Sequence, residues 1–195
     1  MRIVKLLLLS VLVFTSVSCR EQPEETIPTD MTDQQKDMTS SVMIRLIDPL
    51  DEPEFYCVDV PGYGQKVQLD SPLTAHTLKA FGSADEMWVL NYPAVGQIYI
   101  PAYERCIEAE NAKAGASLYL KQPGESPLQR CTLTESGSIV LAEHTDLGFA
   151  VAPSEGEPTG GPSHLKRNLN LANLAETPEK LTKWKLVKDA ESWPQ

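Results

Sequence analysis

Three weakly similar repeats follow one another along this chain, and a repeat of this kind restricts the possible folds more than any other feature of the sequence. Each repeat spans roughly 40 to 50 residues and contains four short segments in which apolar and polar residues alternate, a pattern typical of half-buried β-strands. The expected first strands are residues 42–46, 96–100 and 137–141; the second strands are 57–60, 106–109 and 148–151; the third strands are 67–69, 117–120 and 168–171; the fourth strands are 86–89, 129–132 and 182–185. The chain is therefore predicted to be all-β.

Three repeats that each expose an apolar face have to share one core, and closing the sheet also removes free strand edges. A closed architecture with threefold pseudosymmetry is the simplest arrangement that meets both requirements. The one helix-friendly stretch, residues 170–183, is interrupted by Pro178. Trp88, Cys131 and Trp184 hold corresponding places in the fourth strands, so we expect them to pack in the core.

The N-terminal residues have the composition of an export signal. Arg2 and Lys5 begin an apolar run that ends in small residues before Cys19. The run is too short for a membrane span with ordinary flanks, and a polar, acidic segment follows it instead of a basic one. Residues 1–18 are therefore predicted to be a signal peptide that is removed.

The rest of the chain divides into a tether, a domain and a tail. Residues 20–41 contain no aromatic residue and carry six acids against two bases, so they cannot bury enough surface to fold alone. We expect residues 19–41 to form a disordered tether and residues 42–188 to form one domain. Residues 189–195 are a short tail.

The charge of the chain excludes two classes of partner. The formal net charge is -10 at pH 7. An acidic surface gains nothing from counterion release on a polyanion, so neither nucleic acid nor an anionic lipid surface is an expected partner.

Ser16-Val17-Ser18-Cys19 resembles the lipobox of bacterial lipoproteins. The resemblance implies that Cys19 is acylated, with palmitate or a similar chain, and becomes the N-terminus. Two or three chains would hold the protein firmly, because each buried methylene contributes about 0.8 kcal/mol. Arg20 stands where an Asp would signal inner-membrane retention in enteric bacteria, which implies the outer membrane or cell surface. The alternative is an ordinary signal peptide that leaves Cys19 as a free thiol or a disulfide partner.

Residues 55–62, FYCVDVPG, resemble the start of a repeat in the ricin B-type β-trefoil family. The family's closing Q-x-W motif is degenerate here: Met87-Trp88 and Lys183-Trp184 keep the Trp, and Gln129-Arg130-Cys131 keeps the Gln. The resemblance covers the domain and implies a β-trefoil of three pseudo-symmetric four-stranded repeats, mostly used in this family to bind carbohydrate.

The family's sugar site uses an acid on the second strand, an aromatic platform on the third strand and polar groups before the closing Trp. An acid can accept hydrogen bonds from sugar hydroxyls, and a ring can stack on a pyranose. Repeat two is the most complete, with Glu108, Tyr119 and Gln129. The alternatives are that Tyr119 is an exposed strand aromatic and Glu108 a solvated charge.

The other two repeats match the family's site less well. Repeat one keeps Asp59, Gln68 and Asp85 but has Asp70 at the platform place, with Tyr63 nearby as a substitute. Asp59 could instead cap the turn that follows it. Repeat three has Ala150 for the acid and Ala172 for the platform, so it is not expected to bind sugar in the family's way.

Neither the cysteines nor the histidines form a known catalytic or metal motif. The family's usual disulfide partners are replaced by Pro72 and Gln122, so only a pair between Cys106 and Cys131 is considered, and three buried free thiols are at least as reasonable. His76, His144 and His164 are isolated in the sequence without zinc-type spacing. We expect no catalytic residues, no metal and no cofactor.

Three functions remain open. The first is a lipid-anchored envelope protein that binds a glycan through repeat two, repeat one or both. The second is a trefoil that has lost sugar binding and docks a protein partner as a delivery subunit, as in toxins of the cytolethal distending type. It predicts an exposed apolar or aromatic patch. The third is a structural role in the envelope.

Overall fold

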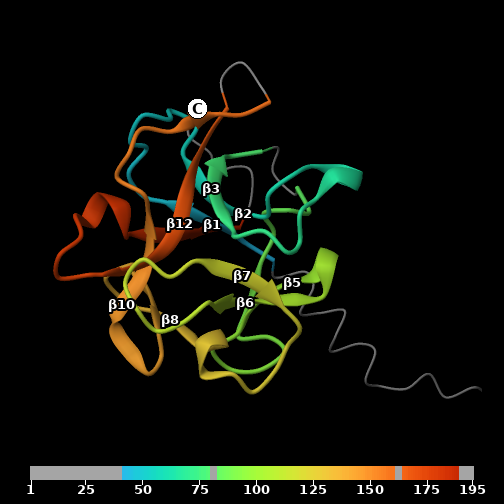
Figure 1. Cartoon of the computed structure of the whole chain (residues 1–195), viewed down its shortest axis with the longest axis vertical. Helices are drawn as coiled ribbons and strands as arrows, with labels where there is room; N and C mark the ends of the chain where they lie inside the picture. Colours follow the sequence, from blue (N-terminus) through green and yellow to red (C-terminus); the bar gives the residue numbers. More distant parts are fainter. Residues whose placement is uncertain (1–40, 80–82, 161–163, 189–195) are drawn as a thin grey trace, which may run out of the picture.

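The computed structural model describes residues 41–79, 83–160 and 164–188. Its strands are β1 (Met43–Leu46), β2 (Tyr56–Asp59), β3 (Thr74–Thr77), β4 (Val89–Leu90), β5 (Ile98–Ile100), β6 (Arg105–Ala109), β7 (Leu118–Lys121), β8 (Cys131–Leu133), β9 (Ile139–Leu141), β10 (His144–Val151), β11 (Glu157–Pro158), β12 (Leu165–Asn173) and β13 (Trp184–Val187). Four 3-10 turns lie between them: η1 (Gly64–Lys66), η2 (Pro101–Tyr103), η3 (Pro127–Gln129) and η4 (Glu179–Leu181). The all-β prediction is confirmed (Figure 1). The predicted signal peptide, the tether up to residue 40, Cys19 and the tail lie outside the described residues.

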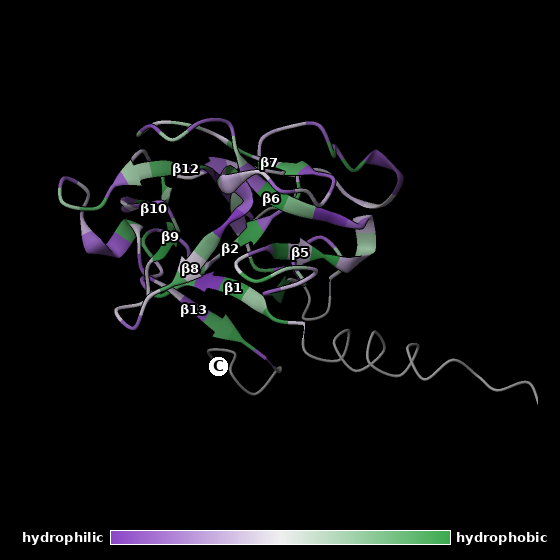
Figure 2. Ribbon diagram, turned by 90° about the horizontal axis from the view of Figure 1, so that it is seen from below, coloured by the Kyte–Doolittle hydropathy of each residue, from purple (hydrophilic) through white to green (hydrophobic). Residues whose placement is uncertain are grey.

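The last strand of each repeat pairs with the first strand of the next. Backbone contacts within each repeat, between Val42 and Trp88, Gly96 and Cys131, and Gly137 and Trp184, complete a closed ring. β4 pairs with β5, β8 pairs with β9, and β13 returns to pair with β1, all antiparallel. Figure 2 shows β13 beside β1, although the two strands come from opposite ends of the domain. Corresponding residues meet in these pairs, because Trp184 lies opposite Leu46 and Cys131 lies opposite Leu141. The ring therefore pairs strand edges that an open sheet would leave free.

The two middle strands of each repeat form a hairpin. The hairpins are β2 with β3, β6 with β7, and β10 with β12. Strands β3 and β12 also pair with each other, so the hairpins of repeats one and three share a sheet. The hairpin of repeat two meets that of repeat three at an isolated bridge between Ser117 and Asn170, beside which the amide of Gly115 donates to the carbonyl of Leu171 at 2.8 Å.

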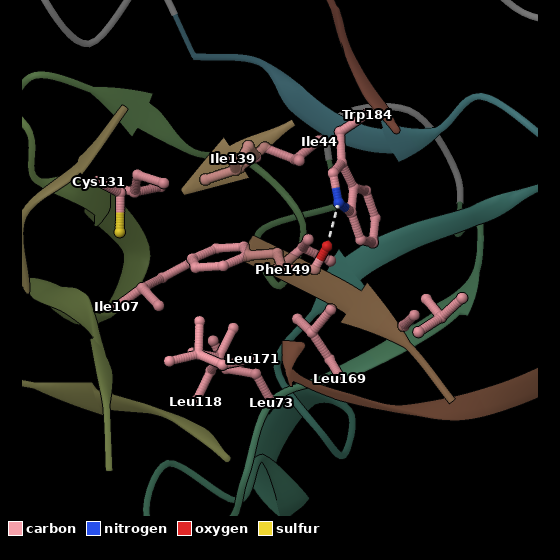
Figure 3. Packing of buried hydrophobic residues seen from close by; sticks show 14 of the residues in the cluster. Ile44, Leu73, Ile107, Leu118, Cys131, Ile139, Phe149, Leu169, Leu171 and Trp184 are labelled. Atoms are coloured by element: carbon pink, nitrogen blue, oxygen red, sulfur yellow. Dashed lines mark hydrogen bonds between the residues drawn. The ribbon is translucent and has the colours of Figure 1, made fainter. Parts of the chain in front are cut away.

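Trp88 and Trp184 make the same hydrogen bond at corresponding positions of the core. Nε1 of Trp88 donates to the carbonyl oxygen of Val58 at 3.1 Å, and Nε1 of Trp184 donates to that of Phe149 at 3.0 Å (Figure 3). Both rings are buried. Cys131, also buried, holds this place in repeat two and has no indole N–H to donate. The core packing predicted for these three residues is confirmed.

Residues from all three repeats meet in one core. Figure 3 shows the ring of Phe149 among side chains from other strands. The buried cluster includes Leu73, Leu118 and Leu169, which hold corresponding places in the three hairpins. Burial of apolar surface contributes about 25 cal/mol per Å², so a core shared by three repeats stabilises all of them together.

The predicted third strand of repeat one is wrong. Residues 67–69 lie in a loop. The strand that pairs with β2 is β3, which begins only at Thr74. The loop is held by its own hydrogen bonds, in which the amide of Gln68 donates to the carbonyl of Pro61 at 2.8 Å. Val67 and Leu69 still pack partly against the core, which explains why this loop has a strand-like alternation.

The predicted fourth strands begin too early. Each one starts at or just after the closing core residue, at Val89, Cys131 and Trp184. Turns η3 and η4 occupy the residues before β8 and β13, and a turn also precedes β4. These turns bring polar side chains back over the hairpins, which is where the candidate site lies.

Candidate functional site

Three equivalent positions lie on the side of the hairpins that faces away from the core. The register places Asp59 opposite Thr74 in repeat one, Glu108 opposite Tyr119 in repeat two, and Ala150 opposite Asn170 in repeat three. Successive side chains of a strand point to opposite faces, so these pairs turn away from the core while their neighbours enter it.

This register corrects two predicted platform positions. Asp70 was expected at the platform place of repeat one, but it lies in the loop with its side chain 97% exposed, 3.4 Å from Arg105 Nη1. The residue opposite Asp59 is Thr74. In repeat three Ala172 pairs with Gly148, and the residue opposite Ala150 is Asn170. Both errors arise because strand partners are set by register between distant segments.

In repeat one the acid is already bound inside the protein. Asp59 is buried, and Lys79 Nζ lies 2.6 Å from its Oδ1 and 3.2 Å from Oδ2 of Asp85. The hydroxyl of Tyr103 donates to the other oxygen of Asp85. The amide of Lys79 donates to the buried carboxyl of Glu86 at 3.1 Å. Lys79 thus already binds the carboxylate of Asp59, which a sugar hydroxyl would have to contact.

Burial governs the ionisation of this cluster. Loss of water raises the pKa of Asp59 to about 7, against the pull of Lys79, and raises the pKa of Glu86 well above its ordinary value. The pKa of Lys79 is also raised, although burial opposes it, because of the carboxylates around it. One ammonium therefore faces three carboxyl groups, those of Asp59, Asp85 and Glu86, in a site that water hardly reaches.

The other residues predicted for repeat one do not join this cluster. Gln68 accepts a hydrogen bond from the hydroxyl of Ser71, and Tyr63 is 78% exposed. Within the described part of the chain, no hydrogen bond links either side chain to Asp59. Asp85 does lie beside Asp59, joined to it through Lys79.

In repeat two the predicted residues lie together. Nε2 of Gln129 donates to Oε2 of Glu108 at 2.8 Å, and Glu108 faces Tyr119 across the hairpin. Lys121 Nζ lies 5.6 Å from the centre of the Tyr119 ring. Glu108 and Tyr119 are both half-buried, so an acid and an aromatic ring remain accessible beside each other.

Gln129 is held by a complete set of hydrogen bonds. Its Nε2 also donates to the carbonyl of Gln122 at 2.9 Å, and its Oε1 accepts from the amide of Gly124 at 3.0 Å and from Nε2 of Gln97 at 2.6 Å. Gln129 and Gln97 are both buried. Sequence reasoning missed Gln97, because it begins an apolar strand and gives no motif. Glu108 is therefore positioned by a buried amide that is itself fixed.

Repeat three carries a hollow at the equivalent place. Its volume is about 440 Å³, and Ala150 and Asn170 line it. The sequence predicted no sugar site of the family's kind here, and the register places Ala150 and Asn170 at the two positions that Glu108 and Tyr119 hold in repeat two. No pattern in the sequence predicted that this space would be open.

The three cysteines that the structure describes are buried. Cys57, Cys106 and Cys131 are buried and free, so the disulfide considered between Cys106 and Cys131 is not formed. Burial raises the pKa of Cys106 to about 11 and that of Cys131 to about 12, which leaves both as thiols.

The tertiary structure brings together two histidines that look isolated in the sequence. The ring centres of His76 and His164 lie 5.8 Å apart. In the described ranges no group of three or more His, Cys, Asp or Glu side chains could hold a metal ion. No helix in the same ranges has the length and hydropathy needed to cross a membrane.

Comparisons with known proteins support the fold. No family model and no curated protein matches the sequence. Among solved structures, the designed threefold-symmetric protein ThreeFoil matches with a TM-score of 0.56 at 13% identity, over 76% of this chain and 98% of that one. The C-half of the earthworm R-type lectin, solved with GalNAc, gives 0.54 at 10% identity, over 77% and 99%. The β-trefoil lectin of the Vibrio vulnificus hemolysin, solved with N-acetyl-D-lactosamine, gives 0.51 at 18% identity, over 76% and 93%.

The ring of paired strands and the three equivalent hairpins define a β-trefoil. Two of these similar structures are named as lectins, one an R-type lectin and one a β-trefoil lectin, and their likeness to this chain agrees with the fold that residues 55–62 predict.

Proposed function

We propose that this protein is a carbohydrate-binding module and that repeat two holds its sugar. The observation that carries the proposal is the arrangement of Glu108, Tyr119 and Gln129, which lie together; among the described residues, no lysine or arginine forms an ion pair with Glu108. Glu108 Oε2 is bound by Gln129, and the rest of the carboxylate can accept hydrogen bonds from adjacent hydroxyls. The Tyr119 ring offers an apolar face beside it.

Repeat one does not support a second site of this kind. Lys79 already binds Asp59 at 2.6 Å, and a ligand would have to displace a buried ion pair. Breaking such a pair by removing one partner costs about 3–5 kcal/mol. Sugar sites on shallow surfaces typically supply only about 4 to 8 kcal/mol in all, which corresponds to millimolar to micromolar affinity.

The alternative of a protein-docking trefoil predicts an apolar patch. Among the described residues, the large hydrophobic side chains that are exposed are Ile47, Tyr63 and Val95. They lie in three different connecting segments, between β1 and β2, between β2 and β3, and between β4 and β5. Single exposed hydrophobic residues are common on protein surfaces. This distribution favours the glycan-binding proposal.

The test is a multivalent glycan-array screen of the full chain beside a Glu108→Ala, Tyr119→Ala double variant. Asp59→Ala is the matched control, because it removes an acid at the equivalent position of repeat one. We expect specific glycan signals that the double variant loses and that Asp59→Ala keeps once its fold has been verified by circular dichroism. Absence of any signal at high valency, or signals unaffected by the double variant, would contradict the proposal.

The place of this module in the cell is a second part of the proposal. The lipobox-like residues before Cys19 support a lipid anchor in the bacterial envelope, at the outer membrane or cell surface. Metabolic labelling with a palmitate analogue should mark the wild-type chain and not a Cys19→Ser variant. Labelling that survives the substitution, or a wild-type chain that stays unlabelled, would exclude anchoring through this cysteine.

A further inference from the structure

Two histidines from different repeats lie beside each other where β3 meets β12. His76 belongs to β3, and His164 comes directly before β12, which begins at Leu165. The two strands run side by side in antiparallel register, with Lys166 opposite His76 (Figure 1). The ring centres of the two histidines are 5.8 Å apart, and their ring planes make an angle of 73°. Folding thus brings together two of the three imidazoles of the chain.

Hydrogen bonds determine which nitrogen of His76 carries the proton. Burial lowers the pKa of His76, so its ring is neutral at neutral pH. Nδ1 lies 2.6 Å from the carbonyl oxygen of Thr77, and because a carbonyl oxygen only accepts, Nδ1 is the protonated nitrogen. Nε2 therefore keeps its lone pair, to which the hydroxyl of Thr159 donates at 3.0 Å. A histidine that donates one ring N–H to a backbone carbonyl and presents the other nitrogen has the usual form of a metal ligand.

The backbone holds His164 close to this nitrogen. The amide of Thr159 donates to the carbonyl of His164 at 2.9 Å, next to the pair that Pro158 of β11 forms with Leu165 of β12. The residue that hydrogen-bonds to Nε2 of His76 is therefore tied to His164 by its own backbone. Rotation of the Thr159 side chain about its Cα–Cβ bond would free the Nε2 lone pair for a cation.

The separation and the inclination of the two rings suit one shared metal ion. A nitrogen lone pair lies in the plane of its ring, so a metal bound by both rings lies where the two planes meet. Planes inclined at 73° meet, whereas those of parallel stacked rings do not. With metal–nitrogen bonds of about 2.0–2.1 Å, two rings on one tetrahedral or wider site have centres roughly 5 to 6.4 Å apart. The observed 5.8 Å lies within this interval.

The charges around the pair are compatible with a cation. The carboxylate of Glu52 attracts positive charge at His76, whereas Lys79 repels it. Lys79 has carboxylate partners of its own, and Lys166 lies 3.6 Å from Glu157. Both ammonium groups are therefore offset by carboxylates, in a chain whose formal net charge is -10.

We propose that His76 and His164 together bind one divalent transition-metal ion of the kind that prefers imidazole nitrogen, such as Zn²⁺. Nε2 of His76 supplies one ligand, a ring nitrogen of His164 supplies the second, and water completes the coordination. Among the described residues, no third His, Cys, Asp or Glu completes a group that could hold a metal, so the site is open and binds more weakly than a closed four-ligand zinc site. The ion connects β3 of repeat one to the start of β12 in repeat three, and its site is separate from Glu108 and Tyr119.

The test is titration of the untagged full chain with ZnCl2, followed by isothermal titration calorimetry and by the NMR signals of the histidine rings. His76→Gln and His164→Gln each remove one ligand. His144→Gln is the matched control, because His144 is exposed in β10. MgCl2 is the control salt, because Mg²⁺ prefers oxygen ligands. Circular dichroism verifies the fold of each variant, and the ring signals of the wild type test the site even where a variant fails to fold.

We expect Zn²⁺ to shift the ring signals of His76 and His164 and to leave those of His144 in place. His76→Gln and His164→Gln should each lower the affinity for Zn²⁺ at least about tenfold, since loss of even an outer partner of a metal ligand has an effect of this size. The double variant should bind no more weakly than either single variant, because one imidazole alone holds the ion poorly. His144→Gln should bind like the wild type.

Four results would overturn the inference. They are a wild-type chain that does not bind Zn²⁺, ring signals of His76 and His164 that do not shift, an affinity that survives both single substitutions, and equal binding of Mg²⁺.

Discussion

Lys79 Nζ lies 2.6 Å from Oδ1 of the buried Asp59, at the position where the resemblance of residues 55–62 predicts an acid that holds a sugar. Asp59 matches the family's motif, but its carboxylate already forms an ion pair with Lys79. Of the three equivalent positions, repeat one is closed by an ion pair, repeat two keeps an accessible acid, and repeat three is an open hollow.

The buried carboxyl cluster makes stability depend on pH. Because burial raises the pKa of Asp59 from 3.8 to about 7, the folded protein keeps a proton there between these values that the unfolded chain releases. The free energy of unfolding should therefore fall as the pH rises from about 4 to about 7. Lys79 acts in the same direction but only far above neutral pH, because its ordinary value is 10.5 and its pKa is raised further in the folded protein.

Urea unfolding at pH 5 and pH 8 measures this effect. Asp59→Asn should reduce the difference between the two conditions and leave the part due to Glu86, whose pKa is also raised, whereas Asp70→Asn, which removes an exposed acid, should leave it unchanged. An equal pH dependence in the wild type and in Asp59→Asn would show that Asp59 does not carry this proton.

Trp184→Phe should destabilise the domain by about 1–3 kcal/mol, because the carbonyl of Phe149 would lose its partner in the core. Trp88→Phe should lower the free energy of unfolding by a similar amount, since it removes the corresponding hydrogen bond to the carbonyl of Val58. Chemical denaturation measures both, with the exposed Tyr63→Phe as a control expected within about 0.5 kcal/mol of wild type. A cost at Trp184 no larger than at Tyr63 would show that the hydrogen bond adds nothing.

Gln97→Leu should weaken glycan binding at repeat two although Gln97 touches no ligand in the proposed site. The substitution removes the hydrogen bond to Gln129 and leaves the carbonyl of Gly124 without this donor, at a cost of about 1–3 kcal/mol in stability. Gln122→Leu is the matched control, because its side chain is exposed and only its backbone carbonyl is used. Titration with the best glycan from the array should show lower affinity for Gln97→Leu alone. Unchanged affinity with lowered stability would mean that Gly124 and Gln122 suffice to hold Gln129.

Gly156→Ala should destabilise the domain by about 1–3 kcal/mol through overpacking. A Cβ atom at this position would lie 2.3 Å from the hydroxyl of Tyr56 and 2.9 Å from Cβ of Leu165. Gly160→Ala has open space around its Cβ and should change stability by less than about 0.5 kcal/mol. Thermal unfolding of the two variants compares them directly, and equal melting temperatures would show that the loop moves to accept the methyl group.

Local sequence patterns determined the fold class and much of the core. Alternation at a period of two is visible in the chain itself, and its three copies predicted a closed all-β molecule with Trp88, Cys131 and Trp184 inside. The same alternation misplaced the third strand of repeat one, because Val67 and Leu69 pack partly against the core from a loop. A local pattern reports that a side chain is buried, and it does not report which strand lies beside it.

The sites depended on contacts between residues that are distant in the chain. The sequence predicted Glu108, Tyr119 and Gln129, because the family's motif keeps them in order. Only the tertiary structure decided that Lys79 would form an ion pair with Asp59 and that Gln97 would donate a hydrogen bond to Gln129. It also decided that a hollow would open beside Ala150. The physical reason is that strand register and the packing of turns over hairpins fix which side chains meet, and both are set by the closed ring as a whole.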